Sequence, residues 1–347
     1  MNNKNERKIK VAISHGDING VGYEVILKTF ADSRMFDFCT PVVYGSTKVA
    51  SYHKKLLASL PQEMAFSSVH DAFEAQDAKF NFINLTQDEI KIDLGKSTDV
   101  AGRLSRESLN RACEDLKAGK VDVLVTAPIN KRNIQAPDFD FPGHTEYLSH
   151  QFGSSSLMFM VCDRIRIGIV TNHLALKDVP AALTHNLLFD KMMLMNESLK
   201  RDFGITRPKI AVLALDPHAG DGGVIGDFDK RVIRPVIDDV QSKGVLAYGP
   251  FPSDGFFGNS EFNNFDGVLA LYHDQGLIPF KLMSFTEGVN YTAGLPYVRT
   301  SPAHGTAYDI AGKDKACEQS FRSAVFLACN IYRNRLEYDE LNADPLK

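Results

Sequence analysis

The sequence predicts an α/β protein built as two α/β/α domains with a cleft between them. Three observations favour this class. Short apolar runs alternate with helical repeats along the chain, as in strands joined by helices. Several of these runs end in polar segments containing histidine, which is typical of the carboxyl edge of a sheet. With 347 residues, 44% of them hydrophobic, the chain is long enough for two cores.

The amino-terminal part predicts a strand, a glycine loop and a helix, in that order. Residues 8–14 are apolar, 16–22 contain three glycines, and 23–30 have helical spacing. The glycines match neither G-x-G-x-x-G nor G-x-x-x-x-G-K-[ST], so we interpret the loop as a tight turn. Direct binding of a nucleotide phosphate is the weaker alternative.

The same alternation continues to the end of the chain. The further strands are predicted at 41–45, 80–83, 121–125, 165–170, 210–215 and 267–271. Helical spacing of apolar residues predicts helices around 109–116, 183–199 and 321–332. The motifs then divide the chain into two expected domains. The first, 1–140 plus 300–347, contains both termini and the cofactor side. The second, 141–299, contains the metal and substrate residues and a dimer interface.

Composition narrows the class of protein. A net charge of -4 gives no basic surface of the kind that binds nucleic acid or anionic membranes. The first ten residues lack the apolar core of a secretion signal, and no stretch approaches the roughly 20 apolar residues of a membrane span. Five scattered cysteines without a C-x-x-C pair give neither a disulfide framework nor a thiolate metal site. We therefore expect a cytoplasmic enzyme.

Three histidines follow predicted strands directly: His173 in T-N-H-L, His218 in P-H-A-G-D-G-G and His273 in Y-H-D-Q-G. Their shared context predicts that the imidazoles converge around a divalent metal ion with an open coordination position. Histidine nitrogens suit zinc or cobalt, and magnesium is the third candidate. The alternative is that each histidine is an ordinary structural residue.

Other segments offer groups for an anionic substrate. Lys281, Asn290 and Arg299 lie near turns or strand ends, and their donors suit a phosphate. Thr126-Ala-Pro-Ile-Asn-Lys131 leaves a strand and leads to Gly143-His144-Thr145-Glu146. The last polar segment is 303–313.

Taken together, these segments resemble the 4-hydroxythreonine-4-phosphate dehydrogenase family, PdxA, of pyridoxal phosphate biosynthesis. The resemblance is carried, in the family's order, by V-T-A-P-I-N-K, G-H-T-E, T-N-H-L, P-H-A-G-D-G-G, G-P-F-P-S-D, Y-H-D-Q-G-L-I-P-F-K, G-V-N-Y-T-A-G-L-P-Y-V-R-T-S and H-G-T-A-Y-D-I-A-G-K. The last motif is also similar to the nucleotide-binding segment of isopropylmalate and isocitrate dehydrogenases. The resemblance therefore implies the fold of that superfamily.

The resemblance also implies roles for individual residues. The metal ligands are His173, His218 and His273. The substrate-binding residues are His144, Thr145, Lys281, Asn290 and Arg299. The residues expected to contact NAD are His304, Gly305, Thr306 and Asp309. The candidates for the proton acceptor are Asp254, Lys131 and a metal-linked water. The family forms homodimers that share each metal site, so His273 is expected from a different chain than the other two ligands.

The implied reaction is oxidation of the C3 hydroxyl of 4-phosphooxy-L-threonine by NAD. It gives 2-amino-3-oxo-4-phosphooxybutanoate, which decarboxylates to 3-amino-2-oxopropyl phosphate. A divalent ion on the hydroxyl would stabilise the alkoxide and favour hydride transfer. Oxidation of 4-phospho-D-threonate or 4-phospho-D-erythronate is the alternative within the family, and a metal-dependent hydrolase is a remoter one.

One segment departs from the family pattern. The first loop reads S-H-G-D-I-N-G-V-G-Y-E, where better-known members have proline before the first glycine and P-A-G in place of I-N-G. Asp216 also replaces a common asparagine. The roles of His15 and Asn19 therefore stay open at this point.

Overall fold

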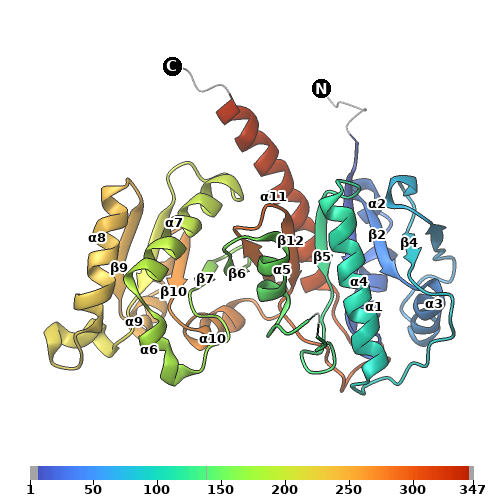
Figure 1. The fold of residues 1–347 in the computed structure, drawn as a ribbon, viewed down its shortest axis with the longest axis horizontal. Helices are drawn as coiled ribbons and strands as arrows, with labels where there is room; N and C mark the ends of the chain where they lie inside the picture. The colour runs from blue at the N-terminus through green and yellow to red at the C-terminus, as the bar shows by residue number, and fades with distance from the viewer. Residues whose placement is uncertain (1–6, 138, 344–347) are drawn as a thin grey trace. The chain divides into compact units, whose positions relative to one another are not determined.

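The structure, a computed structural model, describes residues 7–137 and 139–343. It consists of two compact units, drawn in Figure 1: unit 1 comprises Met1–Tyr147 and Tyr297–Tyr332, and unit 2 comprises Leu148–Pro296 and Arg333–Lys347. The carboxyl-terminal segment is divided between the two units, and the described residues 333–343 belong to unit 2.

Unit 1 contains a parallel sheet with the strand order β3-β4-β2-β1-β5-β12. The strands are β1 (Ile9–Ser14), β2 (Cys39–Gly45), β3 (Ser67–Val69), β4 (Asn81–Asn84), β5 (Val123–Thr126) and β12 (Val298–Pro302). β2 and β5 are buried along their whole length, as strands are in a sheet covered on both faces. The expected strands at 8–14, 41–45, 80–83 and 121–125 are confirmed.

The helices of unit 1 begin where the sequence supplies capping groups. They are α1 (Gly22–Ala31), α2 (Met35–Phe38), α3 (Thr47–Leu56) and α4 (Asp99–Lys117). The hydroxyl of Thr98 accepts a hydrogen bond from the Ala101 N–H (3.3 Å) and caps α4. α4 then packs across β1, β2 and β5, so it covers the centre of the sheet (Figure 1).

Unit 2 contains a mixed sheet with the strand order β11-β6-β7-β10-β8-β9. The strands are β6 (Leu157–Val161), β7 (Arg166–Ile169), β8 (Lys209–Leu213), β9 (Leu246–Phe251), β10 (Gly267–Ala270) and β11 (Val289–Ala293). β7, β10, β8 and β9 run parallel, whereas β6 runs antiparallel to both of its neighbours. The expected strands at 165–170, 210–215 and 267–271 are confirmed.

Two helices cover opposite faces of this sheet. Side chains alternate between faces along a strand, so Gly267 and Ala270 of β10 face opposite ways. A Cβ at Gly267 would meet Met195 and Leu199 of α7 (His185–Arg201), whereas Ala270 lies against Gly276 of α10 (His273–Met283). The further helices of unit 2 are α6 (Val179–Ala182), α8 (Arg234–Ser242) and α9 (Ser253–Gly258).

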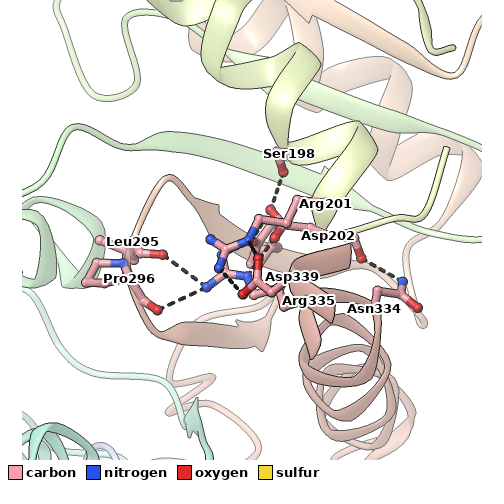
Figure 2. Close-up of polar contacts among 9 residues, drawn as sticks. Ser198, Arg201, Asp202, Leu295, Pro296, Asn334, Arg335 and Asp339 are labelled. Atoms are coloured by element: carbon pink, nitrogen blue, oxygen red, sulfur yellow. Dashed lines mark hydrogen bonds and ion pairs between the residues drawn. The ribbon is translucent and has the colours of Figure 1, made fainter. Parts of the chain in front are cut away.

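The boundary between the units falls inside α5 (His144–Phe152) and inside α11 (Gln319–Ala343). A buried ion pair explains why the end of α11 belongs to unit 2 (Figure 2). Arg335 Nε donates to Asp202 Oδ1 at 2.7 Å, and its Nη1 donates to the carbonyls of Leu295 and Pro296. Tyr291 completes the cluster by donating to Asp202 Oδ2 at 2.6 Å.

Candidate functional site

The three predicted metal ligands and Asp254 lie at one edge of the unit 2 sheet. Parallel strands end at the same edge. β7 leads to His173, β10 to His273, β8 to His218, and β9 to Asp254 in the first turn of α9. The chain order therefore puts each of these residues just past the carboxyl end of its strand, as expected.

His173 and His273 are brought together because β7 and β10 are neighbours. Their ring centres are 5.9 Å apart, with 38° between the ring planes. Two imidazoles that bind one tetrahedral ion through bonds of about 2.0–2.1 Å place their ring centres roughly 5 Å apart. The pair therefore fits a shared divalent ion after a small adjustment.

Asp274 sets the orientation of His273. The His273 Nδ1–H donates to Asp274 Oδ1 at 2.6 Å, which directs Nε2 away from the carboxylate. Histidine ligands of metal ions commonly donate their second ring nitrogen to a carboxylate, which fixes the tautomer and increases the basicity of the ligating nitrogen. The arrangement matches that of a metal ligand.

His218 lies in an unusual loop. His218, Ala219 and Asp221 have φ values of 53°, 52° and 45°, so a left-handed turn contains three residues other than glycine. Such residues rarely adopt this conformation, and strained backbone clusters at functional sites. Gly220 is needed there, because a Cβ would lie 2.3 Å from the Gly226 carbonyl oxygen.

The structure does not bring the three histidines into one group. Within residues 7–137 and 139–343, no three His, Cys, Asp or Glu side chains are close enough together to hold a metal ion. One chain thus offers a pair of imidazoles. The pair within one chain is His173 with His273.

Unit 1 holds a buried cation, Arg299, beside a neutral histidine. The Arg299 side chain is 1% exposed and donates to Thr126 Oγ1 through Nη2 at 2.7 Å and Nε at 3.2 Å. Burial lowers the pKa of Arg299 to about 9, and the Glu146 carboxylate opposes that shift. Arg299 therefore stays positively charged at pH 7, on β12 next to β5.

His144 lies at the start of α5. Burial and the positive charges of Arg299 and Lys131 lower the pKa of His144 well below its usual value, so its imidazole is neutral at pH 7. Its Nε2 atom is buried and, in the described part of the chain, makes no hydrogen bond. A buried polar atom without a partner is costly, so this nitrogen is placed to meet a ligand.

The remaining substrate candidates have different environments. Thr145 is buried, at 5% exposure, next to His144. In unit 2, Asn290 lies in β11, and its buried Oδ1 makes no hydrogen bond with any described residue. Lys281, in the last turn of α10, is exposed, as are the proton-acceptor candidates Asp254 and Lys131.

The predicted cofactor segment follows β12. His304 is half-buried, and its Nε2 is another buried atom without a partner in the described residues. Burial lowers the pKa of His304, which is therefore neutral at pH 7. Gly305 and Asp309 are exposed, and Thr306 is half-buried with its carbonyl accepting from the Val21 N–H at 3.0 Å.

The first loop, whose role the sequence left open, is structural at His15. His15 is buried and stacks on Tyr23, which stacks in turn on His53; both pairs of ring centres are 5.2 Å apart. The Nδ1–H of His15 donates to the Gly16 carbonyl at 2.7 Å, and the Nε2–H of His53 donates to the Ile18 carbonyl at 2.9 Å. These contacts fix the shape of the loop.

Comparison with known proteins identifies the family that shares these residues. The family model described as pyridoxal phosphate biosynthetic protein PdxA matches residues 37–328. The chain belongs to the PdxA family. This confirms the resemblance drawn from the motifs and, with it, the expectation that the chain is a dehydrogenase.

Relatives across bacteria support the same membership. A 4-hydroxythreonine-4-phosphate dehydrogenase of Bacteroides thetaiotaomicron is 48% identical, with 99% of this chain and 94% of the relative covered. One from a Sulfurihydrogenibium species is 37% identical, with 94% and 99% covered. The crystal structure of the enzyme of that name from Klebsiella pneumoniae superposes with a TM-score of 0.82 at 32% identity, covering 95% of this chain and 99% of that one.

A structure outside this group shares the fold. The terephthalate 1,2-cis-dihydrodiol dehydrogenase of Burkholderia xenovorans matches with a TM-score of 0.61 at 22% identity, covering 93% of this chain and 98% of that one. The α/β class expected from the sequence is confirmed by the PdxA structures and by the sheets described above.

Sequence reasoning missed residues that act through others. Thr126, Glu146 and Asp274 received no role, although each lies in a quoted motif, beside Ala127, Thr145 and His273 respectively. The signal for Asp274 was its position next to a candidate ligand, since a carboxylate beside a ligating histidine commonly orients it. Thr126 gave no such signal, because its partner Arg299 lies far along the chain.

Proposed function

We propose that this PdxA-family chain oxidises 4-phosphooxy-L-threonine with NAD and a divalent metal ion, as part of pyridoxal phosphate biosynthesis in the cytoplasm. The observation that carries the proposal is the imidazole pair of His173 and His273, oriented by Asp274 at the carboxyl edge of the sheet. The product, 2-amino-3-oxo-4-phosphooxybutanoate, would then lose carbon dioxide to give 3-amino-2-oxopropyl phosphate.

His173 and His273 would hold the metal ion, with His218 as the third ligand. When bound, a divalent ion lowers the pKa of a hydroxyl next to it and polarises a carbonyl. Zinc, cobalt and magnesium are the candidate ions, and nitrogen ligands favour the first two. Because the described residues of one chain bring only two imidazoles together, we propose that the metal site is completed by a ligand from a second copy.

An exposed apolar surface around these histidines supports a homodimer. On α10, Ile278 and Leu282 are 60% and 84% exposed, and Phe285, just past the end of this helix, is 81% exposed. The segments after the other two histidines add Leu174, Leu176, Val224 and Ile225, with exposures of 40%, 68%, 84% and 50%. Apolar groups gathered in this way mark an interaction surface. A second copy is the occupant we propose, because the same segments carry the metal ligands.

The charged ends of the substrate would be held by Arg299 and Lys281, with Asn290, His144 and Thr145 as hydrogen-bonding partners. A neutral His144 can donate or accept one hydrogen bond through Nε2 without adding charge. Arg299 brings a fixed cation whose orientation Thr126 sets. Together these groups would hold the C3 hydroxyl towards the cofactor.

Asp254 is the proton acceptor we favour, because it is a carboxylate at the same edge of the sheet as the metal ligands. Lys131 and a metal-linked water are the alternatives. NAD would contact His304, Gly305, Thr306 and Asp309, and the buried Nε2 of His304 is the atom of that segment that lacks a partner among the described residues.

Steady-state NADH formation tests the proposal. The purified chain, loaded with zinc or cobalt, is given NAD and 4-phosphooxy-L-threonine, 4-phospho-D-threonate or 4-phospho-D-erythronate in parallel. We expect the highest kcat/KM with phosphooxy-threonine. Higher turnover of the acids without the amine would reassign the substrate within the family. Release of phosphate without NADH would instead indicate a hydrolase.

A further inference from the structure

Asp17, a buried carboxylate in the first loop, ties together segments that follow three adjacent strands of unit 1. It is 0% exposed, and both of its oxygens accept hydrogen bonds. Oδ1 accepts from the Asn19 N–H at 2.8 Å. Oδ2 accepts from Tyr308 OH at 2.7 Å and from Asn133 Nδ2 at 2.8 Å. These residues follow β1, β12 and β5, which lie side by side.

The segment after β12 is held on both sides of a strained residue. Ala307 has a φ of 43°, a left-handed conformation that residues other than glycine rarely adopt. On one side, the Thr306 carbonyl accepts from the Val21 N–H at 3.0 Å; on the other, Tyr308 donates to Asp17. Gly20 permits the first contact, because a Cβ there would lie 2.7 Å from Thr306 O.

The second contact is a strong one. Tyr308 donates to an ionised group in a buried setting, where such hydrogen bonds are stronger than those between neutral groups. Burial and the Asp17 carboxylate raise the pKa of Tyr308, so the hydroxyl keeps its proton near neutral pH. Neither Asp17 nor Tyr308 is needed to explain the metal pair or the substrate groups.

We propose that Asp17 is a positioning residue for NAD: through Tyr308 it holds Ala307 left-handed and so fixes the shape of the His304–Asp309 segment that meets the cofactor. This inference rests on the proposed NAD-dependent function. It assigns a role to the first loop that does not require the loop to touch a phosphate.

The test compares NAD affinity, measured by isothermal titration calorimetry on the metal-loaded protein, in four variants. Tyr308→Phe keeps the ring and removes the donor, and we expect NAD to bind about tenfold more weakly, as for loss of a hydrogen bond to a charged group. Ala307→Gly in the Tyr308→Phe background should restore most of that loss, because glycine adopts the left-handed conformation without strain. Ala307→Gly alone completes the cycle.

Tyr332→Phe is the matched control, because it also removes a hydrogen bond from a tyrosine hydroxyl to an aspartate. Tyr332, on α11, donates to Asp122 at 3.2 Å. We expect its NAD affinity to equal that of the unaltered protein. Amide hydrogen exchange without NAD gives a second readout: the Val21 N–H, bonded to Thr306 O, should exchange faster in Tyr308→Phe than in Tyr332→Phe.

The outcomes separate the two proposals. If the unaltered protein binds NAD and Tyr308→Phe binds it equally well, with unchanged exchange at Val21, the role of Asp17 is wrong and the proposed function stands. If Tyr308→Phe weakens NAD binding but Ala307→Gly in the same protein does not restore it, the proposed positioning through Ala307 is wrong. If the unaltered protein does not bind NAD, the proposed cofactor is wrong, and the inference fails with it.

Discussion

Arg299 and Thr126, which are 173 residues apart in the chain, form a two-point hydrogen bond between adjacent strands of unit 1. The bond fixes the plane of a buried guanidinium that the proposed function assigns to the substrate. Arginine holds an anion through two parallel N–H groups, whereas lysine presents a single point charge. The identity of this cation therefore matters more than its charge.

Arg299→Lys should raise the KM for the phosphorylated substrate by tenfold or more while leaving the protein folded, because the charge remains and the planar donor pair is lost. Steady-state kinetics and circular dichroism provide the measurement. Arg201→Lys is the control, since Arg201 pairs with Asp339 in unit 2 outside the site. An unchanged KM in Arg299→Lys would remove Arg299 from substrate binding.

Asp274→Asn should weaken binding of zinc about 10–100-fold, the usual cost of losing a carboxylate that orients a histidine ligand. Competition with a metallochromic chelator measures this affinity. Asp239→Asn is a close control, because Asp239 pairs with His185 Nε2 at 2.7 Å in the same kind of exposed histidine–carboxylate contact. Equal zinc affinity in both variants would contradict the role of Asp274.

Arg335→Ala should lower the free energy of unfolding by about 3–5 kcal/mol, because it leaves the Asp202 carboxylate buried without its cation. Arg335 and Asp202 are 6% and 2% exposed. Arg201→Ala, which breaks the exposed pair with Asp339, should cost about 0–1 kcal/mol. Urea denaturation of both variants measures these free energies. Similar losses in both variants would mean that the contacts of Arg335 drawn in Figure 2 do not anchor α11.

Acid should destabilise unit 1 through its buried histidines. Burial lowers the pKa of both His15 and His53 from 6.5 to about 4. Because the folded pKa lies below the unfolded one, the unfolded chain binds more protons between these values. The stabilisation is complete above about pH 6.5 and is lost as the pH falls towards 4.

The urea concentration at the midpoint of unfolding should therefore be lower at pH 5 than at pH 7.5. This decrease should be smaller in His53→Gln, because glutamine keeps a donor for the Ile18 carbonyl and does not titrate in this range. A fall of the same size in both proteins would show that His53 is not one of the groups responsible.

Much of the fold could be predicted because local pattern and buried structure agree. The predicted strands 121–125 and 267–271 contain the apolar runs 123–125 and 267–271, as parallel strands with covered faces require. The run Leu157–Val161 was not predicted, because a short apolar run alone does not separate a strand from a helix. The helix predicted at 321–332 is shorter than α11, which continues to Ala343. Apolar spacing did not reveal the last part of the helix, because the residue that holds it in place is charged Arg335.

The residues of the candidate site could be predicted from the sequence, but the contacts between segments far apart in the chain could not. Histidines after strand ends were recognisable, and β7 next to β10 brings two of them together. The order of strands in the sheet was not readable from spacing, so the isolation of His218 from that pair was not foreseen. The contact of Asp17 with Tyr308 joins positions 291 residues apart, and no local pattern indicates it.

His173 and His273 are proposed to bind one divalent ion, and X-ray absorption spectroscopy of the zinc-loaded protein at the zinc edge identifies the ligands of that ion. We expect imidazole nitrogens at about 2.0–2.1 Å from zinc, and fewer of them in each of the variants His273→Ala and His218→Ala than in the unaltered protein. A zinc environment of oxygen ligands alone, unchanged by either substitution, would contradict this proposal.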